Sequence, residues 1–130
     1  MSSHSSMRTP LGRVRSLGSA KSGTADFFRQ RVTALAMLLL TIPVIVIIMM
    51  LLGRNHAAAV QILGAPLVAI ILMLFVIASC WHMKIGMQVV IEDYVHDERL
   101  KLISVIANQF FTWVVGLAAI YAIVKLSSGV

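Results

Sequence analysis

A histidine, a glycine and an acid–phenol pair follow one another along a mainly apolar part of the sequence. They are His82, Gly86, Asp93 and Tyr94. At about 100° per residue, the first three of these residues fall on one face of a helix. Asp93 follows His82 by 11 residues, or about 16 Å along a helix axis. This spacing could join an electron carrier in the membrane to a proton donor at its surface.

His82 is the candidate cofactor ligand. A neutral imidazole binds iron well, and membrane depth suits a haem. Gly86 lies one turn further on and leaves room for a flat ring. The structural alternative is a histidine that hydrogen-bonds a neighbouring helix, and helix geometry leaves both open. Because His4, His56 and His96 lie in the tail and the loops, a second axial ligand would have to come from another chain.

Asp93 and Tyr94 are candidates for proton transfer at the end of the same helix. A phenol beside a carboxylate can donate a hydrogen bond to a carbonyl and relay a proton. Quinone reduction needs this chemistry, because each quinone takes up two protons with two electrons. The alternative is an interfacial tyrosine with ordinary flanking charges, and the two residue types alone do not decide between these interpretations.

Arg31 precedes the first long apolar run. Its guanidinium could bind an acidic group such as a haem propionate through two parallel hydrogen bonds. Plain anchoring by positive charge at the membrane surface is the alternative.

The composition predicts the elements that position these residues. Of 130 residues, 59% are hydrophobic and 12% charged, whereas soluble domains carry about 25% charged residues. Three apolar runs, at about 28–52, 60–91 and 103–126, meet the length of roughly 18 residues expected of a membrane span. The predicted fold is therefore an all-α membrane protein, with a flexible basic arm at 1–24 and a three-helix transmembrane domain at 25–130.

The distribution of charge predicts the orientation. The net charge is +6, and six basic residues precede the uncharged stretch from Ala34 to Leu52: Arg8, Arg13, Arg15, Lys21, Arg29 and Arg31. This basic segment has no interleaved aromatic residues and leads straight into a span, which favours membrane retention over nucleic-acid binding. Arg99 and Lys101 follow the second span. The positive-inside rule then places the N-terminus and the second loop in the cytoplasm.

The segment from His82 to Val95 resembles a signature of the succinate dehydrogenase hydrophobic membrane anchor subunits, of the alphaproteobacterial type. In that family a histidine is followed by glycine after four residues and by an Asp-Tyr pair after eleven and twelve, as in this chain. Residues 26–34 resemble the start of the family's first membrane helix. The resemblance extends from about residue 11 to the end of the chain.

The resemblance implies a role for each candidate residue. His82 would be an axial ligand of haem b, shared with a histidine of the cytochrome b subunit. Tyr94 would hydrogen-bond a carbonyl of ubiquinone, the substrate, and Asp93 would support that site. Arg31 would lie near a haem propionate. Family members often carry a histidine where this chain has Ala25, which removes one expected propionate contact.

The resemblance also implies partners and a location. A flavoprotein subunit and an iron–sulfur subunit would deliver electrons from succinate at the cytoplasmic face of the bacterial inner membrane, or at the matrix face in a mitochondrion. This chain has neither Gly-rich dinucleotide motifs nor Cys clusters, so we expect no catalysis by the chain alone. The alternatives are a haem-free structural anchor, a fumarate reductase-type anchor and a small transporter subunit, which would more often show inverted repeats.

Overall fold

The computed structural model describes residues 22–129, which form four helices. They are α2 (Ser22–Leu51), α3 (His56–Gly64), α4 (Pro66–Tyr94) and α5 (Glu98–Ser128). Three of them, α2, α4 and α5, are long and apolar enough to cross a membrane. The prediction of an all-α protein with three membrane helices is confirmed. Of the proposed basic arm, residues 1–21 lie outside the described residues, and residues 22–24 belong to α2.

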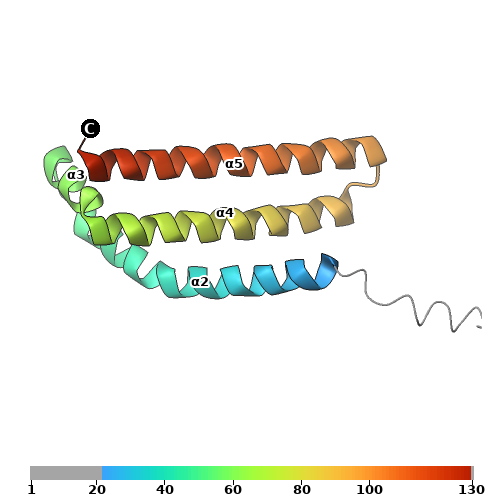
Figure 1. Ribbon diagram of the computed structural model, residues 1–130, viewed down its shortest axis with the longest axis horizontal. Coiled ribbons are helices and arrows are strands. Elements are labelled where there is room, and N and C mark those ends of the chain that lie inside the picture. Colours follow the sequence, from blue (N-terminus) through green and yellow to red (C-terminus); the bar gives the residue numbers. More distant parts are fainter. Residues whose placement is uncertain (1–21, 130) are drawn as a thin grey trace, which may run out of the picture.

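The central element of the bundle is α4. Figure 1 shows the three long helices side by side, with α4 between α2 and α5, and both outer helices pack on it. Few side chains are buried between them, and these are Ile47, Ala69, Ala78, Ile85, Ile91, Thr112 and Ile123. One face of α4 therefore packs against α2 and another against α5. Most apolar side chains of the bundle point outward, where lipid or other chains can cover them.

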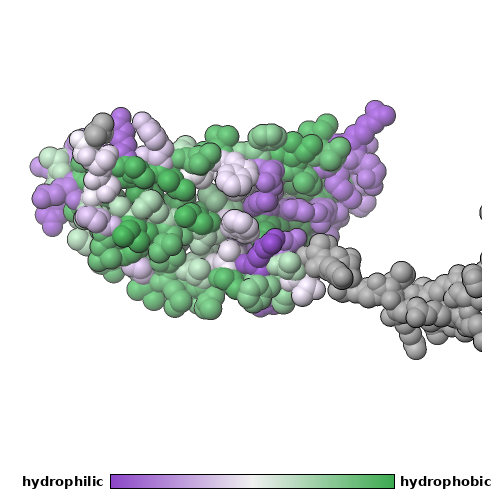
Figure 2. All heavy atoms as spheres, viewed as in Figure 1, coloured by the Kyte–Doolittle hydropathy of each residue, from purple (hydrophilic) through white to green (hydrophobic). Residues whose placement is uncertain are grey.

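The polar residues gather at the two ends of the bundle. Figure 2 shows a broad hydrophobic band between hydrophilic ends. The start of α2, the end of α4 and the start of α5 lie at the same end (Figure 1), which we call the basic end. It brings together Arg29, Arg31, Arg99 and Lys101. Among the described residues, the basic side chains at the start of α2 and those at the start of α5 thus share one side, in agreement with the charge pattern.

The second apolar run is divided at Ala65. We expected one span from about residue 60, but α3 ends at Gly64 and α4 begins at Pro66. Ala65 has an extended backbone, with φ −61° and ψ 131°, as the residue before a proline prefers. Pro66 fits the first turn of a helix because it has no N–H to satisfy there. A short separate helix therefore precedes the second membrane helix.

Pro43 lies inside α2, and Figure 1 shows this helix curving over its second half. A proline lacks the N–H that would bond the carbonyl of Leu39, and its ring crowds the preceding turn. The curve directs the end of α2 toward α3, which contacts it.

Replacing Gly64 by alanine is expected to lower the free energy of unfolding by about 1–3 kcal/mol, because the site has no room for a methyl group. A Cβ at Gly64 would lie 2.7 Å from the backbone carbonyl oxygen of Leu126 in α5. The measurement is denaturant or thermal unfolding of the protein in detergent. Ala57→Val, on an exposed position of the same helix, is the control. Equal destabilisation by both variants would contradict this prediction.

Candidate functional site

The imidazole of His82 is held against α2. Its Nδ1 lies 3.1 Å from Oγ1 of Thr33, and both residues are half-buried. Because α4 is continuous from Pro66 to Tyr94, His82 sits about 18 Å from the end of that helix. Among residues 22–129, Thr33 is the one hydrogen-bond partner of the ring. His82 can therefore hydrogen-bond the neighbouring helix through Nδ1 and still offer its other ring nitrogen, Nε2, to iron.

Gly86 marks a close approach between the same two helices. A Cβ at Gly86 would lie 3.3 Å from Nε2 of Gln30 in α2, so the missing side chain lets Gln30 pack there. The Oε1 atom of Gln30 is buried and lacks a hydrogen-bond partner among the described residues. A buried amide oxygen without a donor is costly. The contact between Gln30 and Gly86, one turn from His82, thus places a polar amide within an otherwise apolar helix interface.

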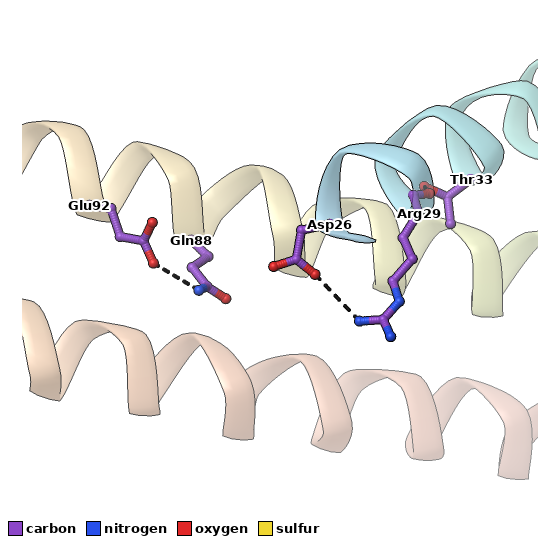
Figure 3. A network of polar contacts seen from close by, with 5 residues as sticks. All are labelled: Asp26, Arg29, Thr33, Gln88 and Glu92. Atoms are coloured by element: carbon purple, nitrogen blue, oxygen red, sulfur yellow. Dashed lines mark hydrogen bonds and ion pairs between the residues drawn. The ribbon is translucent and has the colours of Figure 1, made fainter. Parts of the chain in front are cut away.

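An open cleft of about 460 Å³ continues from Gln30 toward the basic end. Residues of α2 and α4 line it: Asp26, Phe27, Gln30, Arg31, Ile85, Gln88, Val89 and Glu92. Figure 3 shows two polar pairs here, one in each helix. Arg29 Nη1 lies 3.4 Å from Asp26 Oδ1, and Gln88 Nε2 donates to Glu92 Oε1 at 2.8 Å. Both pairs are exposed, so the ion pair contributes about 0–1 kcal/mol and the hydrogen bond about 0.2–0.5 kcal/mol.

Arg31 reaches along its own helix. The central carbon of its guanidinium lies 5.0 Å from the centre of the Phe27 ring, a cation–π arrangement. No carboxylate in the described part of the chain pairs with Arg31. Its donors therefore remain available at the edge of the cleft, where an acidic group could bind.

Asp93 and Tyr94 are the last two residues of α4, and both are exposed, Tyr94 by 77%. Neither lines the cleft, which Gln88 and Glu92 border instead. At about 100° per residue, Asp93 stays near the face of His82, whereas Tyr94 is turned by about 120°. The pair thus points outward from the basic end, where a small molecule or another chain can reach it.

The face of α4 that points away from α2 packs against α5. Asn108 Nδ2 donates to the carbonyl of Lys84 at 2.9 Å. Beside it lies an apolar groove of about 160 Å³, bordered by Lys84, Trp81, Cys80 and Gly116 among others. Lys84 is turned by about 160° from His82 around the helix, so this groove is separate from the histidine site. Within residues 22–129, no group of three or more His, Cys, Asp or Glu side chains could hold a metal ion.

Two residues of the site, Thr33 and Gln30, were not recognised from the sequence as candidates. They are three positions apart, and so they share one face of α2. Polar residues with this spacing in a membrane helix indicate a face that hydrogen-bonds a neighbour. This spacing is visible in the sequence, but it does not identify the partner residue or the helix that carries it.

Comparison with known proteins identifies the family. Residues 5–116 match the family described as "Succinate dehydrogenase/Fumarate reductase transmembrane subunit". The "Succinate dehydrogenase hydrophobic membrane anchor subunit" of Paracoccus denitrificans is 31% identical over 93% of this chain and 93% of its own length. Its namesake in Rickettsia bellii is 31% identical, over 89% of this chain and 93% of its own length. The protein of the same name in Rickettsia conorii is 32% identical, with the same two coverages.

No solved structure matches. The resemblance to membrane anchor subunits of alphaproteobacteria is confirmed by the three relatives. The family match covers most of the chain and agrees with three long apolar helices. The chain therefore belongs to the succinate dehydrogenase/fumarate reductase transmembrane subunit family.

Proposed function

We propose that this chain anchors a succinate dehydrogenase in the membrane, supplies one axial ligand of haem b and forms part of a ubiquinone site. One observation carries the proposal. An imidazole within a membrane helix is held through Nδ1 by a neighbouring helix, while no described residue bonds Nε2. The relatives named as succinate dehydrogenase membrane anchors support the choice of complex.

The residues around His82 fit a haem that is shared with another chain. His82 would hold the haem iron through one nitrogen, and the cytochrome b subunit would supply the other ligand, a histidine. Arg31 has unpaired guanidinium donors that suit a propionate. Gly86 keeps the α2–α4 contact narrow beside the ligand. When bound, haem b supplies one-electron transfer within the membrane.

Asp93 and Tyr94 form this chain's part of the quinone site. The phenol of Tyr94 donates a hydrogen bond to a carbonyl oxygen of ubiquinone and so orients the ring. As electrons arrive, that oxygen gains negative charge, and the hydrogen bond strengthens. Asp93, adjacent in sequence and also exposed, passes protons toward the reduced quinone.

The basic end faces the cytoplasm of a bacterial cell in this proposal. Arg29, Arg31, Arg99 and Lys101 share that end, and basic residues are retained on the cytoplasmic side of inner membranes. The iron–sulfur subunit docks there and brings electrons from the flavoprotein subunit, which oxidises succinate. The quinone site then lies between the electron donor and the membrane.

The test is purification of the complex from the native membrane through a tag on this chain. We expect the cytochrome b, iron–sulfur and flavoprotein subunits to copurify, with one haem b, measured in a reduced-minus-oxidised spectrum, per flavin. A stoichiometric complex that contains no haem would contradict the haem proposal and favour a structural anchor. Copurification without any flavoprotein would contradict the proposed complex.

A further inference from the structure

The hydroxyl of Thr33 makes three polar contacts. It lies 2.8 Å from the carbonyl oxygen of Arg29 and 3.1 Å from that of Gln30, both in the preceding turn of α2. The third contact is with His82 Nδ1 at 3.1 Å. The two carbonyls can only accept a hydrogen bond, whereas the ring nitrogen can either donate or accept.

The distances favour one direction for the third contact. Thr33 has one hydroxyl proton, and its shortest contact is to the carbonyl of Arg29. With the proton placed there, the oxygen has only lone pairs left toward α4. His82 must then carry its proton on Nδ1 and donate it to Thr33. In a neutral imidazole, the other nitrogen, Nε2, is left with the lone pair that a metal requires.

We propose that Thr33 is a positioning residue that selects the Nδ1–H tautomer of His82 and fixes the ring so that Nε2 binds haem iron. This inference rests on the proposed haem ligation by His82. A hydrogen bond from the distal N–H of a metal-bound histidine makes the ligand more basic and orients its ring. Through the carbonyls of Arg29 and Gln30, the ring is also tied to the first turns of α2.

The inference predicts an effect of Thr33→Val on the haem. Valine keeps the branched shape of threonine but has no oxygen to accept from Nδ1–H. The imidazole becomes a weaker donor to iron, so the ferric form is less stabilised and the haem reduction potential rises. A less restrained ring also shifts the low-spin ferric EPR signal, and we expect haem transfer to apomyoglobin to be about tenfold faster.

The experiment uses the purified four-subunit complex with three variants. Thr33→Ser keeps the hydroxyl and should retain the potential and EPR signal of the unmodified complex. Thr41→Val is the matched control: Thr41 Oγ1 bonds only the carbonyl of Met37 in its own helix, at 2.6 Å, among the described residues. Succinate oxidation by an artificial acceptor should be unchanged in all of them. If Thr33→Val does not assemble, Thr33→Ala removes the same acceptor.

The outcomes separate this inference from the proposed function. Loss of haem in His82→Ala, together with an unchanged potential, EPR signal and haem transfer rate in Thr33→Val, overturns the role of Thr33 alone. A shift in Thr33→Ser as large as in Thr33→Val, or an equal shift in Thr41→Val, also overturns it. Full retention of haem in His82→Ala overturns both.

Discussion

Replacing His82 by alanine is expected to remove the b-type absorbance from the purified complex, because the other histidines of the described residues, His56 and His96, lie outside the three membrane helices. The imidazole is held on one side by Thr33, and alanine leaves neither ligand nor hydrogen bond. Even the loss of a residue that only supports a metal ligand costs about 10–100-fold in affinity, and loss of the ligand itself costs more. The measurement is the reduced-minus-oxidised spectrum, normalised to the flavin content of the complex.

His56→Ala and His96→Ala are the controls for the haem experiment. Both histidines are exposed, His56 at the start of α3 and His96 between α4 and α5. Complexes with these variants should keep the full haem signal. Oxidation of succinate by an artificial acceptor should continue in all three variants, because the proposed function assigns that reaction to the flavoprotein subunit. An unchanged spectrum in His82→Ala would refute the ligand assignment.

Tyr94→Phe is expected to slow ubiquinone reduction by about a hundredfold, within the usual range for loss of one positioned proton donor. Phenylalanine keeps the ring but lacks the hydroxyl that we propose donates to the quinone carbonyl. Tyr94 is 77% exposed, so the change should cost little stability. The measurement is succinate-dependent reduction of a soluble ubiquinone analogue, compared with reduction of an artificial acceptor by the same preparation.

Tyr121→Phe provides the control for the quinone experiment. Tyr121 is also exposed, by 69%, but lies in α5 toward the end remote from Tyr94. Its quinone reduction should match that of the unmodified complex. Equal loss of both activities in Tyr94→Phe would indicate a general defect of the complex. Full quinone reduction in that variant would count directly against a quinone role for the phenol.

The sequence by itself determined the three membrane helices and the gathering of charge at one end. These features depend on local composition: long apolar runs and the positions of lysine and arginine beside them. The spacing from His82 to Asp93 along the axis was predictable for the same reason, because both lie in one uninterrupted helix. Pro66 also indicates locally where α4 begins, although the continuous apolar run from about residue 60 predicts a single longer helix.

Only the tertiary structure decided which side chains meet between helices. Thr33 and His82 are 49 positions apart, and the approach of Gln30 to Gly86 likewise joins α2 to α4. Hydropathy does not specify such pairs, because lipid is as apolar as the helix surfaces it covers. The packing of membrane helices depends instead on close fit and a few hydrogen bonds between particular faces. These follow from how α2 is rotated against α4, which is a property of the assembled bundle.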